Sequence, residues 1–306
     1  MEKEATAVSA DLYIGHCLAS LLPTIVAANN NRGRVGFDAE DFHSGEAPNA
    51  GPGRLDNAIA EALQHRLLRR CDYLTASSPL IAEAYRTTYG VDAVPVLNVF
   101  PLSEAVEPQP PSGRPSFYWF SQTIGSGRGL EEFIEILRQT ELDVRLDLRG
   151  HVAESYKREL KELVNCSPIE LRFLPPDVPH SMVCNAAGYT AGLGLETNDP
   201  VNRNLCLTNK AFTYILAGTP VILSRTRAQD KLGGELGDAC LMIDLGSPRE
   251  SALTLTSWLA NSDRQSKARV ESFRLGRERF NWDREKDIFL KQVETVLIGQ
   301  STQKQD

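Results

Sequence analysis

The sequence predicts an α/β protein built from two Rossmann-like, doubly wound parallel-sheet domains, of which the N-terminal one is incomplete. Three observations lead to this fold class. Short apolar runs alternate with helical patterns along nearly the whole chain, as in a parallel sheet with helices on its faces. A proline-rich segment interrupts this alternation at 101–115. The length of 306 residues suits two domains of about 150 residues each.

The first series of elements precedes the proline-rich segment. We expect its strands at 11–16, 34–40, 72–78 and 93–100, with helices at 18–30, 54–70 and 79–89. No glycine-rich loop follows the first strand, although a doubly wound domain often carries a phosphate loop there. The segment 101–115 contains five prolines, which favour neither a helix nor a central strand. We interpret it as an interdomain linker.

The second series is longer and opens the second domain. We expect strands at 116–121, 143–150, 169–174, 190–196, 220–225 and 239–245, and helices at 129–140, 154–165, 179–187, 208–217 and 228–236. The tail from 248 to 297 has no strand pattern and predicts two or three helices. We therefore divide the chain into domains at 1–105 and 106–280, followed by a C-terminal helix at 281–306.

Composition and charge limit the function classes. The formal charge of −7 argues against a nucleic-acid footprint, because proteins that follow phosphates usually carry a basic surplus. The six cysteines form no CxxC pair, which favours reduced thiols. No apolar run reaches the ~18 residues of a membrane span, and the first residues lack the apolar core of a signal peptide. We expect a cytoplasmic protein.

The stretch TNKAFTYILAGTPVILS, residues 208–224, has unusually specific ends. Thr208 suits an N-cap, whose hydroxyl accepts from a free backbone N–H of the first turn. Those N–H groups beside Lys210 suit a phosphate or diphosphate. Gly218 suits a left-handed C-cap, and Pro220 prevents the helix from continuing. A plain capped helix explains the local pattern equally well.

A second candidate phosphate site is the loop IGSGRG, residues 124–129. Gly125, Gly127 and Gly129 follow a predicted strand, as in a dinucleotide-binding fold. The third glycine of that fingerprint would fall at 130, where the chain has Leu130. A simpler account is that the glycines let the backbone approach a phosphate while Arg128 supplies charge.

The polar clusters in the first series can each be interpreted as structural or as functional. His16 ends a predicted parallel strand, where ligands of open α/β sheets bind. It fits equally well as a rim histidine bonded to a carbonyl. We interpret a group of acidic and histidine side chains as a polar loop in preference to a metal site: Asp38, Glu40, Asp41, His43 and Glu46. Three arginines one turn apart fit contact with anionic lipid or a lipid-diphosphate acceptor, although a solvated helix face is the commoner explanation: Arg66, Arg69 and Arg70.

The segment NKAFTYILAGTPVI resembles the donor-site helix and strand of GT-B glycosyltransferases, of the retaining, nucleotide-sugar-dependent kind (glycosyl transferases group 1, family 4 type). The resemblance runs from about residue 10 to 297 and is carried by further stretches in the same order: ADLYIGH, VGFDAEDFH, YWFSQTIGSGRGLEEFIEIL and ERFNWDREKDIFLKQV. It implies an N-terminal acceptor domain, a C-terminal donor domain, C-terminal helices that cross back to the first domain, and a site in the cleft between the two.

The resemblance also implies residue roles. The diphosphate of a UDP-sugar or GDP-sugar would meet Arg128 with its flanking glycines Gly127 and Gly129, and the helix start at Thr208, Asn209 and Lys210. Thr213 stands at the ribose position, His16 and Glu196 are the catalytic candidates near the sugar, and Asn198 could hold sugar hydroxyls. No metal and no cofactor beyond the donor are implied. The acceptor is a glycan, lipid or small molecule that the sequence does not identify, and peripheral membrane contact and oligomerisation stay open.

Three departures from the family pattern keep a second hypothesis open. Thr213 replaces a glutamate that would accept from ribose hydroxyls, and Leu205 replaces a glutamate eight residues earlier. Glu196 is the nearest upstream carboxylate able to substitute. The family's first strand and its glycine-rich loop are missing from the N-terminus. The alternative to an active transferase is therefore a weak or inactive relative that acts as a partner or scaffold.

Overall fold

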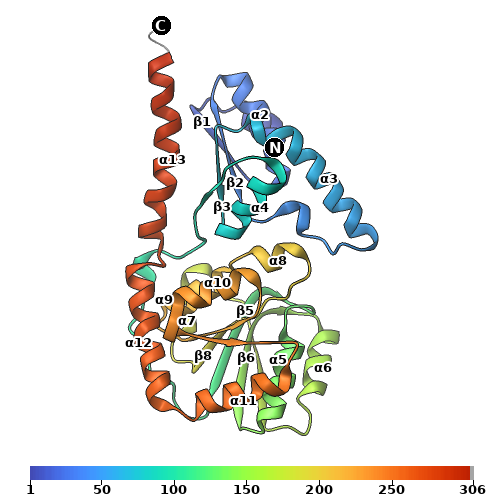
Figure 1. The fold of residues 1–306 in the computed structure, drawn as a ribbon, viewed down its shortest axis with the longest axis vertical. Coiled ribbons are helices and arrows are strands. Elements are labelled where there is room, and N and C mark those ends of the chain that lie inside the picture. Colours follow the sequence, from blue (N-terminus) through green and yellow to red (C-terminus); the bar gives the residue numbers. More distant parts are fainter. Residues whose placement is uncertain (304–306) are drawn as a thin grey trace. The chain divides into compact units, whose positions relative to one another are not determined.

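The computed structural model describes residues 1–303 and, along the last helix, side chains as far as Ile298. It divides into two compact units (Figure 1). Unit 1 consists of residues 1–97 and 198–207 and the chain from Arg284 onward, and unit 2 consists of residues 98–197 and 208–283. The final three residues of the predicted segment 281–306 lie outside the described residues.

Unit 1 contains a parallel sheet whose strand order runs in one direction, β1-β2-β3-β4. Its strands are β1 (Leu12–His16), β2 (Arg34–Ala39), β3 (Tyr73–Ala76) and β4 (Val94–Pro95). Its helices are α1 (Glu2–Thr6), α2 (Leu18–Asn31), α3 (Gly51–Leu67), α4 (Pro79–Tyr89) and α8 (Val201–Leu205), with short 3₁₀ turns η1 (His43–Gly45) and η2 (Leu68–Arg70). Because the order never reverses, unit 1 holds one half of a doubly wound sheet, which confirms the incomplete N-terminal fold.

The start of α4 shows how local sequence fixes the unit 1 elements. Ser78 is the N-cap and its hydroxyl accepts from Ile81 N at 3.1 Å, while Pro79 occupies the first turn, where no N–H is needed. The same hydroxyl donates to Leu205 O at 2.6 Å. This side chain therefore both starts α4 and holds the end of α8 against it.

Unit 2 contains six parallel strands in the order β10-β9-β8-β5-β6-β7. They are β5 (Ser116–Ile124), β6 (Val144–Val152), β7 (Ile169–Leu174), β8 (Ala191–Gly194), β9 (Val221–Ser224) and β10 (Cys240–Ile243). The order reverses between β5 and β8, and ligands of open α/β sheets bind beyond the carboxyl ends of the strands at such a point. We therefore expect a ligand site in the segments that follow β5 and β8.

Two groups of helices pack on the sheet of unit 2 (Figure 1). One group is α5 (Leu130–Thr140), α6 (Glu154–Leu163) and α11 (Pro248–Leu259), and the other is α7 (Met182–Ala186), α9 (Asn209–Leu216), α10 (Arg227–Leu236) and α12 (Ser262–Glu278). The 3₁₀ turns are η3 (Leu102–Glu104), η4 (Pro179–Ser181) and η5 (Gly237–Ala239), and α13 (Trp282–Gln303) begins in unit 2.

A glycine of β8 sets the position of α9. Phe212 and Tyr214 of α9 are fully buried, as the aromatic pattern predicts. A Cβ added to Gly192 would lie 2.1 Å from the ring of Tyr214, so only glycine lets the helix lie this close to the strand. The close packing fixes the first turn of α9, which carries Lys210, against the sheet.

All ten predicted strands are present, with three differences in detail. The run 93–100 yields only the two-residue edge strand β4, and Pro95 is tolerated there because an edge strand has no neighbour on its outer side. Helices α1 and α8 were not predicted. The segment 101–115 contains the single turn η3 and no strand. Within the described residues, no helix combines the length and apolarity needed to cross a membrane.

Candidate functional site

The C-terminal end of α9 agrees with the prediction, whereas its N-terminal end does not. Gly218 has φ of 63°, and the bonds Gly218 N to Ile215 O and Thr219 N to Tyr214 O close a Schellman turn, as predicted. Thr208 occupies the N-cap position, but its hydroxyl makes no capping bond and is buried without a partner. The predicted capping bond is therefore wrong. Thr208 therefore does not cap the first N–H groups of α9, and the helix dipole places partial positive charge at that end.

Lys210 forms the centre of the site with two buried side chains. Its Nζ lies 3.8 Å from Glu196 Oε1, with the two side chains 8% and 2% exposed. The same ammonium lies 5.5 Å from the ring centroid of the fully buried Trp119. Glu196 Oε1 has no hydrogen-bond partner within the described residues. The pair is an ion pair without a hydrogen bond, and the carboxylate keeps unused acceptor capacity.

Glu196 is held by its own backbone. Ser224 Oγ of β9 donates to Glu196 O at 2.6 Å, and Glu196 N donates to Ser224 Oγ at 2.7 Å. Gln229 Nε2 donates to Gly194 O at 2.7 Å. These bonds tie the chain after β8 to β9 and to the start of α10. The carboxylate therefore has a defined place at the carboxyl edge of the sheet.

The glycine loop after β5 lies next to the same segment. Gly127 and Gly129 have φ of 67° and 76°, left-handed values that favour glycine. A Cβ on Gly129 would lie 3.2 Å from Leu195 Cβ, so the loop lies against the residue that precedes Glu196. Arg128, between the two glycines, is half-buried. Topology thus places the Arg128 loop and the Lys210–Glu196 pair at the carboxyl ends of the neighbouring strands β5 and β8.

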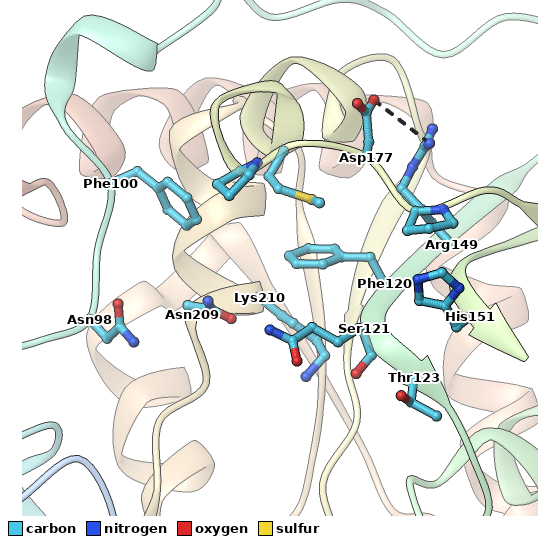
Figure 2. Close-up of a pocket in the computed structure, with 14 residues that line it drawn as sticks. Asn98, Phe100, Phe120, Ser121, Thr123, Arg149, His151, Asp177, Asn209 and Lys210 are labelled. Carbon is cyan, nitrogen blue, oxygen red and sulfur yellow. Dashed lines mark ion pairs between the residues drawn. The ribbon is translucent and has the colours of Figure 1, made fainter. Parts of the chain in front are cut away.

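A cavity of about 770 Å³ opens at these strand ends (Figure 2). Asn209 and Lys210 from the first turn of α9 lie on one side, and Ser121, Thr123 and His151 from β5 and β6 lie on the other. Its further lining comes from Asn98, Phe100, Phe120, Gln122, Arg149, Pro176, Asp177, Pro179 and Met182. Of the predicted phosphate residues, Asn209 and Lys210 line the cavity, whereas Gly127, Arg128, Gly129 and Thr208 are not part of its lining.

Arg149 is a site residue that the sequence reasoning missed. Its Nε donates to Tyr118 Oη at 2.8 Å, its Nη1 donates to Pro175 O at 2.9 Å, and it pairs with Asp177 Oδ2 at 3.8 Å. Hydrogen bonds from Asn185 and from Val178 N, helped by Arg149, lower the pKa of Asp177. The guanidinium is thus held rigidly at one wall of the cavity.

A sequence signal for this wall exists. Arg149 and His151 are two residues apart at the carboxyl end of a buried strand, so they share one face of the sheet. Polar side chains at such a strand end are where ligands of parallel sheets bind. The alternation of residues along β6 does not show on which face of the sheet the cavity lies. For this reason Arg149 and His151 were not predicted as site residues.

The two family positions that lack glutamate have different surroundings. Thr213 is fully buried and its hydroxyl donates to Asn209 O at 2.9 Å. Leu205 is buried in unit 1, at the end of α8. Thr213 does not line the cavity beside Lys210. In this conformation its hydroxyl is committed to the helix backbone.

The other predicted site residues belong to unit 1. His16, Asp38 and Thr75 stand opposite one another on β1, β2 and β3. Thr75 Oγ1 donates to Asp38 Oδ1 at 2.7 Å, and Asp38 Oδ2 lies 3.1 Å from His16 Nδ1. This chain of bonds favours the Nδ1–H tautomer of the neutral ring, which leaves Nε2 as the acceptor. Asn198 is exposed.

The polar cluster of unit 1 separates into two groups. The ligand atoms of His16, Asp38 and Glu40 lie within 4.8 Å of one another. His43 and Glu46 form their own pair, with Nδ1 and Oε1 2.5 Å apart. The arginines at 66, 69 and 70 are exposed.

This chain resembles known proteins in structure. Neither the protein-family models nor the sequences of curated proteins give a match. Solved structures do match. HepE from Anabaena, in complex with UDP-glucose, has 16% sequence identity and a TM-score of 0.73, covering 96% of this chain and 80% of that chain.

Two further structures are similar over comparable lengths. A glycosyltransferase from Rickettsia africae has 10% identity and a TM-score of 0.75, covering 97% of this chain and 79% of its own. Sucrose-phosphate synthase from Thermosynechococcus elongatus has 13% identity and a TM-score of 0.72, covering 94% and 74%. The predicted GT-B fold is confirmed by these similarities.

Proposed function

We propose that this chain, which has the GT-B fold, is a glycosyltransferase that moves a sugar from a nucleoside-diphosphate donor to an acceptor hydroxyl. The observation that carries the proposal is the cavity at the switch point of unit 2, where the buried Lys210 lies in the first turn of α9. An ammonium and a helix N-terminus together suit a diphosphate. The cavity volume of about 770 Å³ is within the range of ligand pockets, ~300–1,000 Å³.

The proposed chemistry is departure of the diphosphate with its developing negative charge stabilised by fixed cations. Lys210 and the α9 N-terminus would stabilise this charge from one side, and Arg128 would do so from the glycine loop. We propose that this charge stabilisation proceeds without a metal ion. Retention at the anomeric carbon is the outcome that the family resemblance implies.

The remaining roles rest on the surroundings of Glu196 and, for His16 and Asn198, on the family resemblance. Glu196 Oε1 is buried beside Lys210 and has no hydrogen-bond partner within the described residues, whereas the Thr213 hydroxyl is committed to Asn209 O. We therefore propose Glu196 as the carboxylate that substitutes for the missing glutamates. His16, with Nε2 as its acceptor, and Asn198 would contact the donor sugar.

Nucleotide release tests the proposal without knowledge of the acceptor. UDP-glucose, UDP-N-acetylglucosamine and GDP-mannose would each be incubated with the protein, and UDP or GDP release would be measured by mass spectrometry, with water as acceptor. We expect release from at least one donor, and loss of more than about 100-fold of that rate in Lys210→Gln, since a removed charge-stabilising donor costs ~10²–10³ in rate.

Arg138→Gln is the matched control, because Arg138 is an exposed cation of α5 that pairs with Glu135 and does not line the cavity. Equal rates in Lys210→Gln and Arg138→Gln would contradict the assignment. Tight UDP binding without any turnover would instead favour the non-enzymatic alternative, a partner or scaffold that keeps the fold.

A further inference from the structure

A second cavity, of about 710 Å³, lies wholly within unit 1. It is formed where the start of α2, the end of α3 and the segment around η1 come together. Its lining consists of Cys17, Leu18, Ala19, Leu22, Pro23, Asp41, His43, Glu46, Leu63 and Leu67. Because the cavity follows β1 and β2, it lies at the carboxyl edge of the unit 1 sheet, where ligands bind in open sheets.

One wall of this cavity is aliphatic. Leu18 and Leu22 come from α2, and Leu63 and Leu67 come from α3. Leu22 is 45% exposed and Leu63 is 40% exposed. An exposed aliphatic wall inside a cavity favours a ligand that brings its own apolar surface.

The rest of the cavity lining includes polar and acidic side chains. The His43 side chain is 4% exposed, its Nδ1 lies 2.5 Å from Glu46 Oε1, and its Nε2 is buried without a hydrogen-bond partner. Asp41 Oδ1 accepts from Asn202 Nδ2 at 2.6 Å. Two carboxylates line the cavity, and among the residues that the structure describes no lysine or arginine does.

These charges decide which ligand head group fits. A phosphate or diphosphate would meet two carboxylates without a compensating cation, which is unfavourable in a partly buried site. A hydroxyl group has no such penalty and can donate to the carboxylates of Asp41 and Glu46, which line the cavity. The arginines at 66, 69 and 70 do not line the cavity, so they do not change this balance.

We propose that this cavity binds the acceptor of the proposed transfer, and that the acceptor is an uncharged molecule with a hydroxyl-bearing head and an aliphatic segment. The ligand's role as acceptor rests on the proposed function. Its chemical class rests on the lining of the unit 1 cavity. The aliphatic segment lies along the leucines of α2 and α3, and a head-group hydroxyl donates to the carboxylate of Asp41 or Glu46.

Alkyl glucosides are suitable probes because they combine an uncharged hydroxylated head with a tail of chosen length. Butyl, hexyl and octyl β-D-glucosides would be titrated by calorimetry below their micelle-forming concentrations. We expect affinity to rise about threefold to fourfold for each CH₂ that the leucine wall buries. We expect hexyl phosphate to bind at least tenfold more weakly than hexyl glucoside.

Two leucines of α3 provide a matched pair of variants. Leu63→Gln should flatten the dependence on tail length, whereas Leu55→Gln should leave it unchanged, because Leu55 is exposed on the same helix but does not line the cavity. The exposed thiol of Cys17 gives an independent readout. Octyl glucoside should slow its alkylation by iodoacetamide, with the exposed Cys166 of unit 2 as internal reference.

The outcomes separate this inference from the proposed function. Absence of alkyl glucoside binding, equal binding of hexyl phosphate, or equal effects of Leu63→Gln and Leu55→Gln would overturn the inference. None of these results would contradict the proposed function, which nucleotide release tests separately. Conversely, the protein could bind glucosides but neither bind nor release UDP. That result would support the unit 1 ligand site and contradict the proposed transferase function.

Discussion

Replacing Lys210 with methionine removes the cation that faces the buried carboxylate of Glu196 and keeps most of the side-chain volume. Their charged atoms are 3.8 Å apart and both side chains are buried. At an effective dielectric constant of about 20, two unit charges at this separation attract by roughly 4 kcal/mol. The variant leaves Glu196 buried and unpaired, which typically costs ~3–5 kcal/mol.

The double variant Lys210→Met/Glu196→Leu separates the ion pair from simple loss of packing. Removing both buried charges is often neutral for stability, so we expect the double variant to lose about 1 kcal/mol or less while Lys210→Met alone loses about 3 kcal/mol. The difference between the double variant and the sum of the single variants measures the coupling between the two charges.

Tryptophan fluorescence is a selective assay for this comparison. The protein has three tryptophans, Trp119, Trp258 and Trp282, and all of them belong to unit 2. Urea unfolding followed at these residues therefore reports the free energy of unfolding of the unit that holds the pair. Unchanged stability in Lys210→Met, or strictly additive losses in the double variant, would refute the reasoning.

Three further predictions follow from particular residues. Asp38→Ala removes the acceptor for His16 Nδ1, so ¹⁵N NMR should show the neutral ring losing its Nδ1–H tautomer; an unchanged tautomer would contradict the bond. Gly218→Ala forces a side chain to φ of 63°, with its Cβ 2.9 Å from Pro108 Cγ, and should lower the free energy of unfolding by about 1–2 kcal/mol in urea titrations. Burial raises the pKa of the Cys240 thiol to about 12. The unfolded chain therefore loses this proton first, and stability should fall by about 1.4 kcal/mol per pH unit between pH ~9 and 12 relative to Cys240→Ala; parallel pH profiles of the two proteins would contradict this.

Strands and long helices were predictable because their signals are local. Each strand of unit 2 is a short apolar run between turn residues, and the start of α4 is marked by Ser78 and Pro79. Helix α8 escaped prediction because its five residues are too few to show a periodicity. The strand β4 was predicted too long because its apolar residues satisfy a strand pattern, whereas its pairing ends at Pro95.

The candidate site was only partly predictable, for a related reason. Asn209 and Lys210 were found because a helix start marks itself in sequence, and a family resemblance supported them. The pairing of Lys210 with Glu196 links the chain after β8 to α9, and nothing local in either segment shows it. Thr208 has the right residue type for a cap, yet its buried hydroxyl makes no capping bond, so residue type alone misled.

Calorimetric titration of UDP and GDP tests most directly whether Arg128 and Lys210 act on one diphosphate. Wild type would be compared with Arg128→Ala, with Lys210→Ala and with the control Arg138→Ala. Because a hydrogen bond to a charged group is worth ~1.5–3 kcal/mol, we predict that each site variant weakens binding about 10- to 100-fold, and that Arg138→Ala does not. Equal nucleotide affinity in all four proteins would contradict the account.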